Sequence, residues 1–399
     1  MVTFDRLATR LLGCYGNEWI ETPNFDRLAT TSAVFDDHFV DTVGAHQGQA
    51  WLTGRHALQQ SVATANLGDS LRAAGVKTRI VTSDRAHISG FTKANVDLCQ
   101  SVNGTDGLEA NPNDVPFAKL VQAGVAALND KTFQSERRLL WLHAPEPGLP
   151  PEGFATLYFE DFEEREAPVA EVPREDWGKQ LAVAAGSVSL VDHWLGVLLQ
   201  ELEANSNDQP TLILIAAAGG RAWMDEFISA SPTVKGDAPV SRLRDQETKS
   251  PLIVSVRHDE RYRRLASIRS QQFVQSTDVL PTLLDWFTPS TNTEDFLHES
   301  LLRIPLYERN HRDAIIFGDE EHCLGIRTRQ WGCLARVSDP KHRIVNPEQF
   351  DEQDWPEQVQ LFIKPDDIWD VTDVSSQYPE ICHRLLTHLD AIRRVETGN

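Results

Sequence analysis

An α/β fold, with a central sheet covered by helices, is predicted by two features of the sequence. Apolar strand-like runs alternate with amphipathic helical segments along most of the chain, as in a doubly wound sheet. Thr211–Ala217 is apolar on both faces, which a strand buried between two helical layers requires. The 399 residues are enough for one large domain with a smaller unit. We place the large domain at residues 1–310 and a small C-terminal subdomain at residues 311–399.

Turn and capping residues indicate where the elements of the large domain begin and end. Thr22 can cap a helix that starts at Pro23, and Gly54 and Gly75 follow two further helices at a position that favours glycine. In order, we predict a strand at Val2–Asp5, helices at Thr22–Ala29, Ala45–Thr53 and Leu67–Ala74, strands at Thr78–Thr82 and Leu139–His143, a long helix at Leu181–Leu202, strands at Thr211–Ala217 and Pro251–Val256, and a helix around Asp278–Phe287.

The pattern changes after about residue 310, where shorter elements follow one another. Ala314–Phe317, Gly325–Thr328 and Gly332–Val337 are typical of short antiparallel strands, and Pro379–Val395 of a final helix. These elements predict a small α+β subdomain. Between Pro145 and Trp177 the chain is acidic and rich in proline, which indicates a surface loop or lid.

Composition narrows the classes of partner. The net charge is −21 and no basic stripe is visible, which argues against nucleic acid or an anionic membrane as a general partner and favours solubility. The five cysteines lie far apart, without the close spacing of a zinc knuckle or redox motif, so a reducing compartment is expected. The apolar stretches predict no membrane span.

The N-terminus leaves the cellular compartment open. No signal peptide follows Met1, so a cytoplasmic location is expected. However, only three residues of the first predicted strand precede Asp5, and a buried strand normally has about five or six. A start further upstream, with an export signal, is therefore the alternative.

A series of short motifs runs in one order along nearly the whole chain. It comprises Leu12–Gly16, Thr22–Ala29, Phe35–Val40, Leu52–Arg55, Leu71–Thr78, Val188–Asp192 with Gly196–Leu199, Ser276–Leu284 and Trp369–Asp373. In this order and spacing the chain resembles the sulfatase family. The resemblance implies an alkaline-phosphatase-like fold: a mixed sheet between helices, an active site at the C-terminal strand ends, and a small four-stranded C-terminal subdomain.

The resemblance also implies which residues should carry the chemistry. Sulfatases use a formylglycine nucleophile, made from Cys or Ser in a C/S-x-P/A-x-R motif, at the start of the helix that ends in Thr-Gly-Arg. Counting back from Thr53-Gly54-Arg55 places Gly44 at the nucleophile, His46 at the Pro or Ala position and Gly48 at the motif arginine. Glycine has no side chain to oxidise. We therefore expect no nucleophile at this position.

A shift of the alignment by one residue does not restore the nucleophile. It would bring Val43 or Ala45 to the position, and neither side chain is reactive. Thr42 carries the nearest hydroxyl, which would serve only after a rearrangement of the loop.

The metal site implied by the resemblance is also reduced. The family uses two adjacent Asp residues after the first strand, and an Asp followed by His or Asn after a later strand, to hold calcium or magnesium. Asp5 is present, but Arg6 takes the second position, and Ala218 and Gly219 take the other two. Two unit charges ~4 Å apart interact by about 4 kcal/mol even at an effective dielectric of about 20, so Arg6 would oppose the ion. We expect no bound metal or other cofactor.

Three further family positions match less closely and agree. Ser83 and Val240 stand where the family has lysines, and Gly148 stands where it has a histidine. Together with Gly44, these changes predict a catalytically inactive member of the family, a pseudoenzyme.

Other polar residues offer weaker alternatives. A transition-metal site could be built from His38 and His46 with a carboxylate, although ordinary polar positions are the simpler interpretation. The residues considered for this site and for reactivity nearby are Asp36, Asp37, His38, Asp41, His46, His87 and Cys14. We interpret His87 as a loop residue and Cys14 as a packing residue.

Binding without cleavage is the predicted function. A helix beginning near Gly44, with Arg6 and Arg221 nearby, could hold an anionic or sulfated small molecule or glycan without cutting it. The simpler alternative is that Arg6 pairs with a carboxylate such as Asp5 or Asp36. The competing functional hypothesis is an active sulfuric or phosphoric ester hydrolase with a non-standard site and little or no metal.

Overall fold

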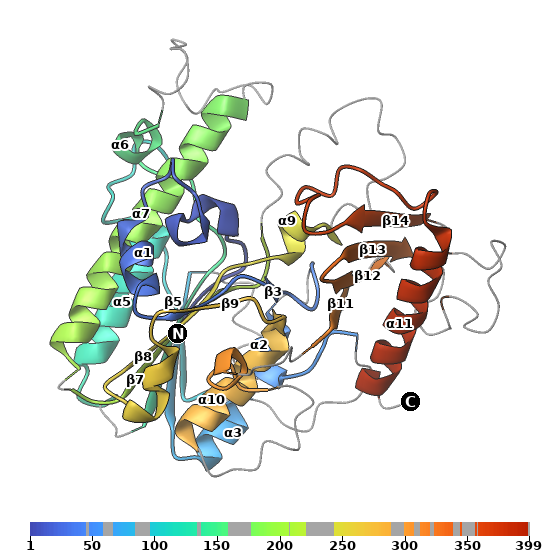
Figure 1. The fold of residues 1–399 in the computed structure, drawn as a ribbon. Helices are drawn as coiled ribbons and strands as arrows, with labels where there is room; N and C mark the ends of the chain where they lie inside the picture. Colours follow the sequence, from blue (N-terminus) through green and yellow to red (C-terminus); the bar gives the residue numbers. More distant parts are fainter. Residues whose placement is uncertain are drawn as a thin grey trace.

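The larger part of the molecule is built on a mixed sheet of eight strands (Figure 1). The strands lie in the order β5-β4-β6-β1-β7-β8-β2-β9; β8 runs antiparallel to β7 and β2, and the other pairs are parallel. Their bounds are β1 Val2–Phe4, β2 Ala33–Phe35, β4 Lys77–Thr82, β5 Leu98–Ser101, β6 Arg138–Ala144, β7 Thr211–Ala217, β8 Leu252–Arg257 and β9 Ile268–Ser270.

The computed structural model describes residues 1–44, 48–58, 67–83, 96–133, 137–158, 177–206, 208–220, 243–288, 299–306, 312–319, 323–337, 344, 356 and 358–397.

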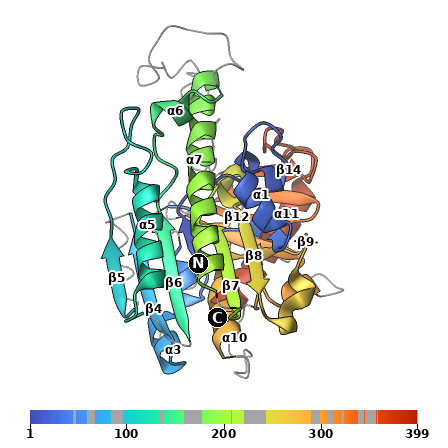
Figure 2. The same cartoon turned by 90° about the vertical axis from the view of Figure 1, so that its left-hand side faces the viewer.

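Helices cover both faces of this sheet, as the alternating sequence pattern predicts. One apolar cluster joins β1, β6 and β7 to the helices of the face seen in Figure 2, and a second cluster joins the opposite face to the remaining helices. The first set is α1 (Pro23–Ala29), α5 (Pro116–Asn129), α6 (Glu152–Ala155) and α7 (Trp177–Ala204), and the second is α2 (Gln49–Thr53), α3 (Leu67–Ala73) and α10 (Val279–Phe287).

Short elements complete the large part. β3 (His38–Phe39) and β10 (Val274–Gln275) pair in parallel, and α9 spans Asp245–Thr248. Single 3₁₀ turns lie at Thr9–Leu11, Gly13–Tyr15, Glu260–Leu265, Ser276–Asp278 and Ile304–Leu306.

The start of α1 is capped from a distance rather than by Thr22. The Thr22 hydroxyl accepts a hydrogen bond from the backbone N–H of Gly13 at 2.8 Å and does not cap the helix. Instead, the buried carboxylate of Asp192 on α7 accepts the backbone N–H groups of Asn24 and Phe25 at 3.0 and 2.8 Å. These are free donors at a helix N-terminus, so Asp192 fixes α1 against α7.

The helix α7 bears on the expectation that no segment spans a membrane. Its segment Gln180–Ala204 has 25 residues, and the mean hydropathy of its most apolar window is 1.5, so by length and composition it would suffice to cross a membrane. However, 78% of its most apolar window is buried inside the structure, as in the central helix of a globular core, so it is weak evidence for a span.

The C-terminal part contains a four-stranded antiparallel sheet, with the helix α11 (Pro379–Thr397) packed on it (Figure 1). Its strands are β11 Ala314–Gly318, β12 Cys323–Thr328, β13 Trp331–Arg336 and β14 Gln358–Ile363. The residues alone predicted the first three, and the fourth was implied by the family resemblance. One apolar cluster joins this sheet to the large part, with Phe317 and Phe362 on one side and Phe39 and Phe273 on the other. The predicted boundary at residues 310 and 311 lies outside the described residues.

Candidate functional site

The positions that match the family's catalytic site meet at the carboxyl ends of β1 and β7. Ala218 donates its backbone N–H to the Phe4 carbonyl at 2.8 Å, and Leu7 donates to Gly219 at 3.1 Å. A Cβ atom added to Gly48 would lie 3.8 Å from the Cβ of Ala218. Gly48 and Ala218, which the family resemblance assigns to one site, are therefore neighbours in the structure.

An aromatic cluster fills the space beside Gly48. The Trp51 side chain is 1% exposed and packs edge-on against Trp141 and His143, with ring centroids 6.1 and 6.3 Å apart. A Cβ on Gly48 would approach the Trp51 ring to 3.2 Å, and its φ of +73° is one that side chains rarely adopt. An arginine at this position, as the family motif requires, would need the loop and the indole to move.

The predicted helix start is wrong. The helix α2 begins at Gln49, and Gly48 precedes it in the left-handed conformation. Gly44 is exposed with a φ of +106°, and residues 45–47 lie outside the described part, His46 included. With five residues, α2 has too few aligned peptide dipoles to support the predicted anion site at its start.

Asp5 and Arg6 differ in their surroundings. The Asp5 carboxylate lies 3.4 Å from Nε2 of the buried His143. The Arg6 side chain is exposed and forms no ion pair or hydrogen bond within the described residues. Asp36 is bound by Arg269 at 2.8 Å instead, so the expected pairing of Arg6 with Asp36 is wrong.

Thr42 is not placed as a nucleophile. It is 4% exposed, bridges to Gly318 of the C-terminal sheet, and directs its hydroxyl to the Val43 carbonyl at 3.4 Å. Gly148 is exposed, and a Cβ there would approach the Asp106 carboxylate to 2.5 Å. Ser83 is half-buried, and its backbone N–H donates to His143 at 3.1 Å.

The alternative transition-metal site does not assemble in the described part of the chain. His38 is buried with Nδ1 3.0 Å from the Ser250 hydroxyl, and burial lowers the pKa of this histidine to about 4. The Asp41 carboxylate accepts the backbone N–H of Ala57 at 2.8 Å. Among the described residues, no group of three His, Cys, Asp or Glu side chains could hold a metal ion.

The remaining predicted residues divide into two groups. Cys14 is half-buried against the core, and burial raises the pKa of its thiol to about 12, which fits a packing role. Outside the described residues lie His46, His87, Arg221 and Val240.

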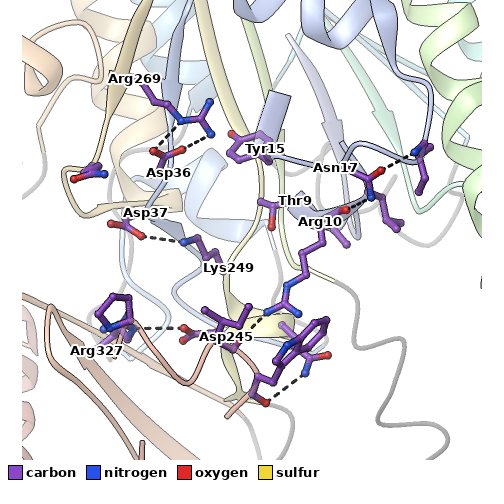
Figure 3. Close-up of a pocket in the computed structure, with 18 of the residues that line it drawn as sticks. Thr9, Arg10, Tyr15, Asn17, Asp36, Asp37, Asp245, Lys249, Arg269 and Arg327 are labelled. Carbon is purple, nitrogen blue, oxygen red and sulfur yellow. Dashed lines mark hydrogen bonds and ion pairs between the residues drawn. The ribbon is translucent and has the colours of Figure 1, made fainter. Parts of the chain in front are cut away.

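A cavity of about 1030 Å³ opens between the loop after β1, the helix α9 and the C-terminal sheet (Figure 3). The described positions that match the family site do not line it. Sequence reasoning missed it, because its walls come from segments far apart in the chain. The lining residues are Ala8–Leu11, Tyr15, Asn17, Trp19, Ile20, Asp36, Asp37, Gln180, Leu181, Asp245, Gln246, Lys249, Arg269, Gln271, Phe273, Arg327, Arg329, Pro365, Ile368 and Trp369.

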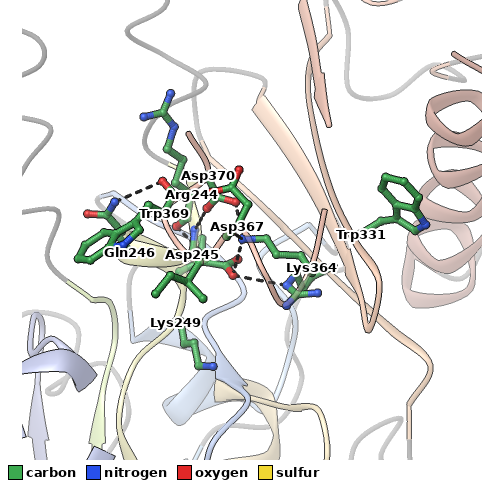
Figure 4. A network of polar contacts seen from close by, with 12 residues as sticks. Arg244, Asp245, Gln246, Lys249, Trp331, Lys364, Asp367, Trp369 and Asp370 are labelled. Atoms are coloured by element: carbon green, nitrogen blue, oxygen red, sulfur yellow. Dashed lines mark hydrogen bonds and ion pairs between the residues drawn. The ribbon is translucent and has the colours of Figure 1, made fainter. Parts of the chain in front are cut away.

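A buried ion network borders the cavity where α9 meets the C-terminal part (Figure 4). The Lys364 ammonium lies 2.9 Å from Asp245 and 2.5 Å from Asp370, and Asp370 also accepts the Asp245 backbone N–H at 2.7 Å. Burial, followed by the nearby Asp245, raises the pKa of Asp370 to about 6. Burial alone would raise the pKa of Asp245, but Arg327 and Lys364 outweigh it and lower that pKa.

Replacing Asp370 by asparagine is expected to remove a pH-dependent loss of stability. An acid whose folded pKa lies above its unfolded value stabilises the fold only while protonated. The Asp370 contribution is therefore present below about pH 4 and lost as the pH rises through about 6. Urea titrations should show the wild-type free energy of unfolding falling relative to Asp370→Asn by about 1–3 kcal/mol between about pH 4 and pH 7. Parallel pH profiles would contradict this.

Comparison with known proteins agrees with the fold. The phosphonate monoester hydrolase of Agrobacterium radiobacter superposes with a TM-score of 0.75 and 15% identity, covering 99% of this chain and 95% of that one. A protein solved with its substrate D-glucosamine-2-N,6-O-disulfate gives 0.67 and 14%, covering 100% and 98%. At these identities the likeness shows the fold alone.

Sequence comparison identifies the family. Human (Homo sapiens) N-sulphoglucosamine sulphohydrolase is 25% identical over 359 residues, which cover 78% of this chain and 66% of that protein, slightly under two thirds of its length. A family model described as Sulfatase matches residues 1–289, well over half of the chain. The chain therefore belongs to the sulfatase family.

Proposed function

We propose that this chain is a sulfatase-family protein that no longer hydrolyses esters and instead binds a sulfated or other anionic ligand. The observation that carries the proposal is the pairing of Gly48 with Ala218 at the carboxyl strand ends, 3.8 Å apart when Gly48 is given a Cβ. The family's arginine and a metal ligand should meet there. Neither residue offers a charge, a nucleophile or a ligand atom.

The residues present do not fit the calcium or magnesium ion of the family. A hard cation needs several oxygen ligands, and Asp5 alone supplies a side-chain carboxylate at the matching positions. Arg6 follows it directly and would repel the ion. We therefore derive no catalytic step through a metal.

Two observations support a binding role. Arg6 is exposed and free of carboxylate partners within the described part, so its charge is available to an anion. The name of the human relative and the ligand of the second structural neighbour both refer to sulfated glucosamine. A sulfated sugar is therefore the first ligand class to test.

An activity assay tests the loss of catalysis. Purified protein should not turn over p-nitrophenyl sulfate or phosphate above its Thr42→Ala variant, with calcium, magnesium or manganese present, because no nucleophile stands at position 44. Metal-dependent turnover that exceeds this variant would overturn the proposal and favour the active-hydrolase alternative.

Calorimetric titration of the same preparation tests the binding role. D-glucosamine-2-N,6-O-disulfate should bind saturably, and Arg6→Ala should weaken it. The absence of saturable binding would reject the sulfated-sugar ligand.

A further inference from the structure

The cavity has walls that suit an apolar ligand. Its volume of about 1030 Å³ lies at the upper end of the usual range for small-molecule sites. Trp369 is 42% exposed and, with the neighbouring Ile368 at 50%, offers an accessible apolar surface on the wall. Apolar and aromatic side chains on the wall are Ala8, Leu11, Tyr15, Trp19, Ile20, Leu181, Phe273, Pro365, Ile368 and Trp369.

The same walls carry a local excess of positive charge. Five cationic and three carboxylate side chains line the cavity, although the whole chain has a net charge of −21. The cations are Arg10, Lys249, Arg269, Arg327 and Arg329, and the carboxylates are Asp36, Asp37 and Asp245. An excess of this sign inside an acidic protein concentrates anions at the site.

One surplus positive charge lies beside the carboxylate of Asp37. This carboxylate is shared by two cations, with the Lys249 ammonium 3.0 Å from one oxygen and the Arg329 guanidinium 2.7 Å from the other. Asp36 is already matched by Arg269 at 2.8 Å. A single negative charge therefore faces both Lys249 and Arg329.

The other surplus charge is Arg10. Its guanidinium stacks 3.5 Å over the Trp369 ring and donates to the Ile368 carbonyl at 2.7 Å, but it pairs with no carboxylate within the described residues. Its second terminal nitrogen, Nη1, is buried without a hydrogen-bond partner among the residues that the structure describes. A buried donor of a charged group is costly to leave unpaired, so this nitrogen points to an acceptor supplied from outside the chain.

We propose that this cavity binds an organic anion with an apolar ring system, whose sulfonate, sulfate or carboxylate group is held by Lys249, Arg329 and Arg10. A neutral apolar ligand would leave the excess positive charge beside Asp37 and at Arg10 uncompensated. An inorganic ion would leave the apolar walls exposed to water. Lys249 and Arg10 line the same cavity in Figure 3. The described positions that match the family site do not line this cavity, and binding here does not depend on loss of hydrolysis.

The test uses a pair of probes that differ mainly in charge. 8-Anilinonaphthalene-1-sulfonate carries a sulfonate that this family's ester chemistry does not cleave, and N-phenyl-1-naphthylamine is its neutral counterpart. Calorimetry and fluorescence should show one saturable sulfonate site per chain, with the neutral probe about 10-fold weaker or more, because it has no anionic group to accept charge-assisted hydrogen bonds.

Two variants locate the anion. Lys249→Met leaves Asp37 paired with Arg329, so the fold keeps its compensation, and Arg10→Met keeps an apolar chain on Trp369. Each should weaken the sulfonate about 10-fold and leave the neutral probe unchanged. Lys249→Arg should restore binding, and Arg6→Met, outside the cavity, should have no effect.

The following results would overturn the inference. Equal affinity for both probes, or sulfonate binding unchanged in both cavity variants, would remove the anion from this cavity. Loss of binding in Arg6→Met alone would place the anion at the family position, so the proposed function would stand without the cavity. Several weak sites per chain would mark adsorption to the surface.

Discussion

Replacing Lys364 by methionine should destabilise the protein by about 3–5 kcal/mol, because removing one partner of a buried ion network leaves the others uncompensated. Lys364 is 4% exposed and lies between the carboxylates of Asp245 and Asp370. Methionine keeps the length of the side chain and removes the charge. After the change, Arg327, 3.5 Å from Asp245, would be the remaining cation beside the two carboxylates in the described network. Urea unfolding monitored by circular dichroism measures the loss.

A surface lysine supplies the matched control. Lys119 pairs with Asp114 at 2.6 Å, but their side chains are 35% and 51% exposed, so water screens the pair far more than the buried network. Lys119→Met should cost less than about 1 kcal/mol. If Lys364→Met costs as little as this control, the network does not stabilise the contact between α9 and the C-terminal part.

Replacing Trp51 by alanine should cost about 3–5 kcal/mol, the usual loss for emptying a buried tryptophan site. Its ring packs against Trp141 and His143 of β6 and lies beside Gly48, which precedes α2. Because β6 is paired with β1 and β4 on its two sides, its side chains have little freedom to close around the hole. Thermal and urea unfolding of the purified variant measure the change.

The phenylalanine variant separates ring packing from hydrogen bonding. In the described part of the chain, the Trp51 indole nitrogen is buried without a hydrogen-bond partner, so Trp51→Phe loses ring volume but no hydrogen bond seen there. Its cost should stay well below that of the alanine variant. Equal losses would mean that the indole nitrogen has a partner after all, such as a bound water.

The fold was largely predictable, because its signals are local. Thr211–Ala217 is a strand over the predicted residues, since an unbroken apolar run has few other stable states. β2 was missed, because three buried residues carry too little periodicity to recognise. The start of α2 was misplaced, because Gly48 adopts a left-handed conformation that composition alone does not reveal.

Of the two candidate sites, the one marked by local motifs could be located from the sequence, and the other could not. The motif alignment assigned Gly48 and Ala218 to the family site, and the structure places them side by side, next to the recognisable elements α2 and β7. The cavity could not be predicted, because Arg10, Lys249 and Arg329 become neighbours through tertiary packing alone. Likewise, tertiary packing brings together Cys333 and Cys382, which are far apart in the chain. A hydrogen bond between their side chains, followed by burial, raises the pKa of Cys333.

The aromatic cluster that joins the C-terminal sheet to the large part has a consequence for protein engineering. Phe39 and Phe273 of the large part interlock with Phe317 and Phe362 of the C-terminal part. Neither half carries a complete core of its own at this junction. Transferring the cavity to another protein would therefore require both the large part and the C-terminal part, together with the aromatic cluster that they share.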